Sequence, residues 1–108
     1  MAKKVYISVP QEGRKRSEVF AEQEALLDRV EAEIMRKYKV HTKWLEPYLI
    51  DTGALVPLEC LGLSLTKLAL ADFVVWSDGW EDSPWCQIEH TCAEQYGIPT
   101  LVLPPEVQ

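Results

Sequence analysis

The segment from residue 71 to residue 99 constrains the fold of this 108-residue chain more than any other part. It opens with the apolar run FVVW at residues 73–76, which is rich in β-forming residues and too short for a buried helix. Ser83 followed by Pro84 is typical of a helix start, because serine caps unpaired N–H groups and proline fits the first helical position. Gly97 is typical of the helix end. The segment predicts half of a βαβ unit, with any site at the carboxyl end of the strand.

One acidic residue falls on the apolar face of that helix. At about 100° per residue, this face gathers the apolar side chains Trp85, Ile88, Cys92, Ala93 and Tyr96. Glu89 projects into the same arc, whereas His90 is expected to face solvent. An ionised carboxylate in an apolar core is costly unless it is paired or lines a cavity. Glu89 therefore reaches a solvent-filled pocket above the sheet, or has a buried partner, or escapes to solvent on a tilted helix.

The rest of the chain alternates between strand and helix patterns. Strands are predicted at residues 5–9, 40–45 and 100–103, and helices at residues 17–38, with Ser17 as the cap, and 56–70. Residues 48–50 are either a further short strand or an extended arm. This alternation predicts parallel strands with helices on both faces. We expect a single domain over residues 1–108: a small α/β three-layer sandwich, flavodoxin-like or Rossmann-like, with a four- to five-stranded parallel sheet.

The composition argues against several classes of protein. A net charge of -6 disfavours a nucleic-acid polymer as partner. No apolar run approaches the ~20 residues of a membrane span, so we expect no membrane partner. The cysteines, at positions 60, 86 and 92, have no metal-binding spacing, and with no export signal they predict reduced thiols in a cytoplasmic protein. We expect no cofactor.

The loop after the first strand is the first candidate site. It precedes a predicted helix N-terminus and contains Gly13, Arg14, Lys15 and Arg16. Helix N-termini attract anions, and arginine can bind phosphate through two hydrogen bonds. The loop is therefore either a phosphate or carboxylate site or a solvated basic turn.

The strand at residues 73–76 is flanked by acidic residues. Asp72 precedes it, a position where aspartate is most often a turn or cap residue, and Asp78 follows it, where active-site residues gather. Carboxylates suit magnesium, but the spacing matches no known metal loop, so we expect no metal. Trp76, Trp80 and Trp85 lie close together in the same stretch. They either stack on a base or sugar ring, or pack on each other or at a subunit interface.

Four motifs together resemble a known family. They are V-Y-I-S-x-P at residues 5–10, A-D-x-V-V-W-x-x-G-W-x-x-S at residues 71–83, a glutamate four positions after Trp85, and A-x-x-x-G-I-P at residues 93–99. This set resembles the nucleoside 2-deoxyribosyltransferase-like superfamily, and within it the small phage and bacterial proteins that are mostly of unassigned function. The resemblance implies a Rossmann-like fold and N-glycosidic chemistry on nucleosides or nucleotides.

The resemblance also implies roles for individual residues. Glu89 corresponds to the nucleophile that attacks the anomeric carbon, and Asp78 or Asp72 to the group that donates a proton to the base or orients it. Arg14 or Arg16 would bind a 5′-phosphate. The candidate substrate-binding residues are Tyr6, Ser8, Gly13, Arg14, Arg16, Trp80 and Ser83. Because such relatives are usually oligomers, we expect a homo-oligomer with a nucleoside or nucleotide as its small-molecule partner.

The chain departs from the family pattern at two positions. Val9 stands where the family usually has glycine, and Trp85 replaces the glycine four residues before the nucleophile. Both side chains fill space that a substrate would use. A non-catalytic nucleotide-binding module, or an assembly module that uses the tryptophans as its interface, is therefore the alternative to an enzyme.

Overall fold

The computed structural model describes residues 2–47 and 57–105, and three parallel strands form its sheet. The central strand β1 (Lys3–Ser8) lies between β2 (Thr42–Leu45) and β3 (Phe73–Trp76), in the order β2-β1-β3. Tyr6 pairs with Leu45 of β2 and with Val74 of β3. Because all three strands are parallel, their carboxyl ends meet at one edge of the sheet.

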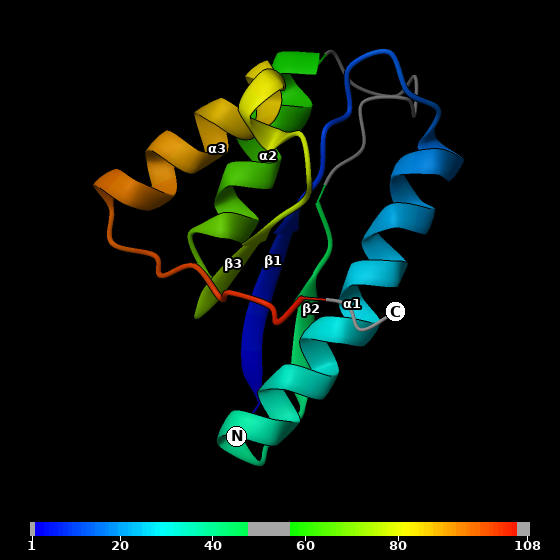
Figure 1. Ribbon diagram of the computed structural model, residues 1–108. Helices are drawn as coiled ribbons and strands as arrows, with labels where there is room; N and C mark the ends of the chain where they lie inside the picture. The colour runs from blue at the N-terminus through cyan, green and yellow to red at the C-terminus, as the bar shows by residue number, and fades with distance from the viewer. Residues whose placement is uncertain (1, 48–56, 106–108) are drawn as a thin grey trace.

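The helices cover both faces of this sheet (Figure 1). α1 (Arg16–Tyr38) packs on one face, and α2 (Pro57–Leu68) and α3 (Pro84–Gln95) pack on the other. Alternate residues of β1 serve the two layers: Ile7 lies in the α1 core, and Tyr6 lies in the core beneath α2 and α3. No helix in the described parts of the chain is both long enough and apolar enough to cross a membrane.

The predicted fourth strand is present only as an isolated β-bridge. Thr100 forms an isolated parallel bridge with Val74, and the Leu101 N–H donates to the Val74 carbonyl at 2.9 Å. The chain then leaves the sheet edge, and Arg29 of α1 holds the Pro104 carbonyl at 2.8 Å. The four- to five-stranded sheet is therefore not formed by the described residues, and the predicted strand or arm at residues 48–50 lies outside them.

Two helix starts show where local prediction works and where it fails. Ser83 caps α3 as predicted, since its hydroxyl accepts a hydrogen bond from the Cys86 N–H at 3.2 Å. α1 begins at Arg16 rather than after a Ser17 cap. The Glu18 carboxylate stabilises this start of the helix, because it accepts a hydrogen bond from the N–H of Lys15, the residue before the helix, at 3.0 Å.

The buried faces of the helices also differ from the predicted ones. Phe20 and Tyr38 belong to the apolar stripe of α1 in the sequence, yet each is 38% exposed; Phe20 lies against Trp44 and Tyr38 against Phe73. On α3, Ile88 and Tyr96 are exposed, although both were predicted to be buried. The buried residues of α3 are Trp85, Cys86, Glu89 and Ala93.

The central strand should dominate stability. Ile7 has no exposed surface, so Ile7→Ala should lower the free energy of unfolding by about 2–5 kcal/mol, the range for a buried isoleucine. Ile88→Ala, at a side chain that is 44% exposed, should change it by less than about 1 kcal/mol. Urea denaturation of both variants measures the difference, and similar losses would show that the core is not centred on β1.

Candidate functional site

The candidate site lies where the loops that follow β1 and β3 leave the sheet. The loop at residues 9–15 leads to α1 on one face, and the loop at residues 77–83 leads to α3 on the other. The two strands are adjacent, and the Ser77 N–H donates to the Ser8 carbonyl at 3.0 Å. A change of direction between neighbouring parallel strands opens a crevice at their carboxyl ends, and ligands in this class of fold bind there.

A buried carboxyl group lies near this edge of the sheet, on the α3 side. The Tyr6 hydroxyl donates to one oxygen of Glu89, and the Ser8 hydroxyl donates to the other at 2.7 Å. Glu89 and Tyr6 have no exposed surface and Ser8 is only 1% exposed. Of the three alternatives for Glu89, the structure shows the one with buried partners, and both partners are residues that the sequence had placed at the site.

The surroundings of Glu89 change its acidity. Burial raises the pKa of Glu89 to about 7, and the charge of Glu12 adds to this, whereas hydrogen bonds with the side chains of Tyr6, Ser8 and Trp85 work against it. Burial and the neighbouring Glu89 charge raise the pKa of Tyr6 well above its usual value. Tyr6 therefore stays a hydrogen-bond donor, while Glu89 is poised to change charge near neutral pH.

Two further buried residues contribute polar groups that the sequence analysis missed. Ser64 of α2 has no exposed surface and its side chain interacts with the Tyr6 hydroxyl. Burial raises the pKa of the Cys86 thiol to about 11, so this cysteine is a poor nucleophile at neutral pH. The three cysteines are thiols with no disulfide bond, in line with the prediction.

The Trp85 side chain helps to cover the Glu89 carboxyl group. It lies one helical turn before Glu89, is 4% exposed and packs in an apolar cluster with Cys60, Leu61 and Cys86. Since Glu89 has no accessible surface, no substrate atom can reach it in this arrangement. Contact between a substrate and Glu89 therefore requires a rearrangement of the residues that cover it.

Glu12 is the main residue of the site that the sequence analysis did not single out. Its Oε1 accepts a hydrogen bond from the Ser83 hydroxyl and its Oε2 from the Trp85 N–H, both at 2.7 Å. Burial acts to raise the pKa of Glu12, but hydrogen bonds with Ser83, with Trp85 and with the backbone of Glu12 and Gln11 together lower it. An acid is favoured at a helix N-terminus, but Glu12 lies 71 residues before the cap of α3, so the sequence offered no signal for this contact.

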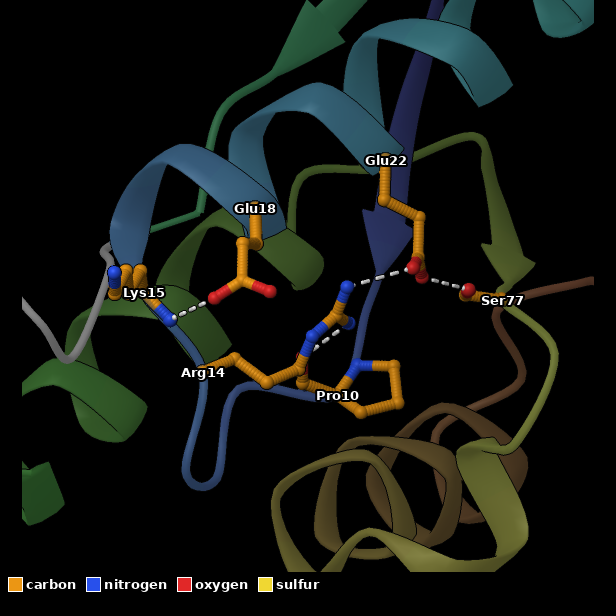
Figure 2. Close-up of polar contacts among 6 residues, drawn as sticks. All are labelled: Pro10, Arg14, Lys15, Glu18, Glu22 and Ser77. Atoms are coloured by element: carbon orange, nitrogen blue, oxygen red, sulfur yellow. Dashed lines mark hydrogen bonds and ion pairs between the residues drawn. The ribbon is translucent and has the colours of Figure 1, made fainter.

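Arg14 ties the basic loop to α1 (Figure 2). Arg14 donates to the Pro10 carbonyl at 3.0 Å and forms an ion pair with Glu22 at 2.9 Å. The second oxygen of Glu22 accepts a hydrogen bond from the Ser77 hydroxyl. The guanidinium that was predicted to bind phosphate is thus engaged by a carboxylate of its own chain.

The start of α1 forms a separate, open hollow. Its volume is ≈ 520 Å³, and its walls are Lys15, Arg16, Ser17 and Phe20. Gly13 precedes it with a φ of 69°, a left-handed conformation that glycine adopts readily. Of the predicted phosphate-binding residues, Arg16 therefore lies beside open space, whereas Arg14 lies in the ion pair with Glu22.

The two predicted catalytic aspartates lie at opposite ends of β3. Asp72 lies at the amino end of β3, where its carboxylate accepts from the Lys4 N–H at 2.8 Å and its own N–H donates to the Lys4 carbonyl at 2.7 Å. The length of β3 separates it from the crevice, so its contacts are structural. Asp78 lies at the correct edge, in the exposed turn before Gly79.

The tryptophans pack on each other and on a histidine. Trp80, in the short 3-10 helix η2 (Trp80–Asp82), stacks on His90 with ring centroids 4.2 Å apart, and Trp76 lies 4.8 Å from the same histidine. His90 is thus half-buried, although it was predicted to face solvent. One face of Trp80, a predicted substrate-binding residue, is covered by this contact.

Nothing outside the chain itself assigns this site. Comparisons with family models, curated proteins and solved structures found no match to the chain. Across residues 2–47 and 57–105, no group of three or more His, Cys, Asp or Glu residues is placed to hold a metal ion. The polar groups that the structure gathers around Glu89 are the hydroxyls of Tyr6 and Ser8 and the thiol of Cys86.

Glu89 should make stability fall as the pH rises. Its folded-state pKa of about 7 lies above the usual 4.5, so the folded protein binds this proton more tightly than the unfolded chain. The resulting stabilisation is complete below about pH 4.5 and is lost as the pH rises through 7, by up to about 3 kcal/mol. Urea denaturation between pH 5 and pH 8 should show this slope in the wild type and a much smaller slope in Glu89→Gln.

The exposed Glu24→Gln on α1 is the matched control for this measurement and should keep the wild-type slope. Identical slopes in the wild type and in Glu89→Gln would show that Glu89 is ionised throughout this pH range.

Proposed function

We propose that this chain cleaves or transfers the N-glycosidic bond of nucleosides, deoxynucleosides or their nucleotides, with Glu89 as the nucleophile. The observation that carries the proposal is the pair of hydroxyl groups, from Tyr6 and Ser8, that hold the two oxygens of Glu89 at the carboxyl end of β1. The motifs that resemble the nucleoside 2-deoxyribosyltransferase-like superfamily contain these same three residues. In the same proposal, the fold is flavodoxin-like or Rossmann-like, with residues 100–103 in the place of a fourth strand.

The reaction breaks one bond at the anomeric carbon and forms another. As the bond from C1′ to the base nitrogen breaks, its electron pair goes to the base, and one oxygen of Glu89 bonds to C1′. A water then hydrolyses this ester to free sugar, or a second base takes the sugar in a transfer. The Tyr6 and Ser8 hydroxyls fix the orientation of the carboxylate, and such positioning is a major part of catalysis.

Among the predicted acids, Asp78 is the one that suits proton donation to the leaving base. It follows β3 directly, at the edge of the sheet where Glu89 lies, whereas Asp72 lies at the opposite edge. For a 5′-phosphate, Arg16 is the better candidate, because it lines the open hollow at the start of α1. The partner in this proposal is a nucleoside or nucleotide, and the working unit is a cytoplasmic homo-oligomer.

The second candidate is a nucleotide-binding module without turnover. The observation that favours it is the complete burial of Glu89 under Trp85, which stands where the resembled family has glycine. A ligand that raises the melting temperature of the protein while no base is released would support this candidate over the enzyme.

The test of the enzyme is the release of free base. The wild type is incubated with deoxynucleosides and deoxynucleoside monophosphates, and base is measured by chromatography. Glu89→Ala should reduce release at least ~10³-fold, the scale on which catalytic groups act, while Asp72→Ala should keep the wild-type rate. The rate should rise with pH through about 7, because the nucleophile is the ionised form of Glu89.

A 2-fluoro sugar analogue should add its mass to the peptide that contains Glu89, since fluorine slows hydrolysis of the covalent intermediate. Absence of base release from every substrate, or release that Glu89→Ala leaves unchanged, would rule the enzyme out.

A further inference from the structure

We propose that Glu12 is a latch that holds the first turn of α3 closed over Glu89, and that this latch must open before a nucleoside can reach the carboxyl group. The consequence for substrates rests on the proposed function. The latch itself is a structural statement about the loop after β1 and the start of α3, and it can be tested separately.

The latch consists of two hydrogen bonds between segments that are distant in sequence. Both oxygens of Glu12 are engaged at 2.7 Å, one by the hydroxyl of Ser83 and one by the backbone N–H of Trp85. Ser83 is the cap of α3, and its hydroxyl also accepts from the Cys86 N–H. A single exposed side chain therefore fixes the cap and the first turn of the helix together.

The turn that Glu12 holds is the one that covers Glu89. The Trp85 N–H is bonded to Glu12, and the Trp85 side chain interacts with Glu89 four residues later on the same helix face. Because the held amide and the covering indole belong to one residue, release of Glu12 loosens the cover, which still packs on its apolar cluster. The negative charges of Glu12 and Glu89 also oppose each other, so opening favours the ionised form of Glu89.

The loop has a suitable pivot next to the latch. Gly13 follows Glu12 with a φ of 69°, a region that glycine enters and leaves at little cost. On its other side, Arg14 is anchored to Glu22 of α1 at 2.9 Å. Glu12 can therefore swing away from α3 while the remainder of the loop stays fixed to α1.

The test compares backbone hydrogen exchange and carboxyl labelling in Glu12→Gln and in a matched control. Glu18→Gln is that control, because Glu18 also caps a helix N-terminus from the same part of the chain but serves α1. In Glu12→Gln, the amides of Trp85 and Cys86 should exchange about five- to tenfold faster, the scale of a lost helix cap. Labelling of Glu89 by a water-soluble carbodiimide and an amine, mapped by mass spectrometry, should accelerate by a similar factor.

The control should leave both α3 exchange and Glu89 labelling at wild-type values. Glu12→Asp keeps the charge but is one methylene too short to reach both donors, so it should show the same acceleration as Glu12→Gln. It provides the test if Glu12→Gln does not fold. Unchanged exchange, or faster exchange without faster labelling of Glu89, would overturn the latch.

Base release separates this proposal from the proposed function. If the protein is an enzyme, Glu12→Gln should raise kcat/KM for base release by about the same factor as the labelling rate. If no variant releases base but exchange and labelling both accelerate, the latch stands and the N-glycosidic function falls. If base release depends on Glu89 while exchange and labelling do not respond to Glu12, the function stands and the latch falls.

Discussion

The carboxyl group of Glu89 inside the core is the constraint on which this side of the structure depends. Burying such a group without partners is expensive, and two hydroxyl groups on alternate residues of β1 supply the partners. Their positions fix the rotation of α3, because the helix must aim Glu89 at Tyr6 and Ser8. Ile88 and Tyr96 are exposed as a result. The need to pair Glu89 with Tyr6 and Ser8 therefore also determines which apolar residues of α3 are exposed.

The parts of the fold that the sequence predicted are those with local causes. The short apolar run of β3, the Ser83 cap and the Pro84 start of α3 each depend on neighbouring residues, and each is present in the structure. The rotation of α3 depends instead on hydrogen bonds to a strand about eighty residues earlier, which helical periodicity does not contain. The segment at residues 100–103 has the composition of a strand, but after a single bridge it turns toward α1.

The residues of the candidate site also divide into those that a local pattern predicted and those that depend on distant contacts. Glu89, Tyr6 and Ser8 were identified because an acid on an apolar helix face and a motif in the first strand are visible in the sequence. Glu12 was missed because a loop glutamate gives no periodic signal and its partners lie 71 and 73 residues away. The partner of Arg14 was also not predicted: its charge suggested an anionic ligand, and the structure pairs it with the Glu22 carboxylate of α1.

Trp85 affects both the burial and the acidity of Glu89. Its side chain helps to keep water from Glu89, and exclusion of water is the main cause of the raised pKa. A glycine at this position would leave the carboxyl group more exposed and more acidic, ready for a substrate but also open to solvent. With tryptophan, about half of the buried Glu89 is protonated at neutral pH, since its pKa is about 7, and in the proposed latch the movement of the first turn of α3 exposes the carboxylate that nucleophilic chemistry needs. The residue that blocks the site is therefore also the residue that would couple its opening to the ionisation of Glu89.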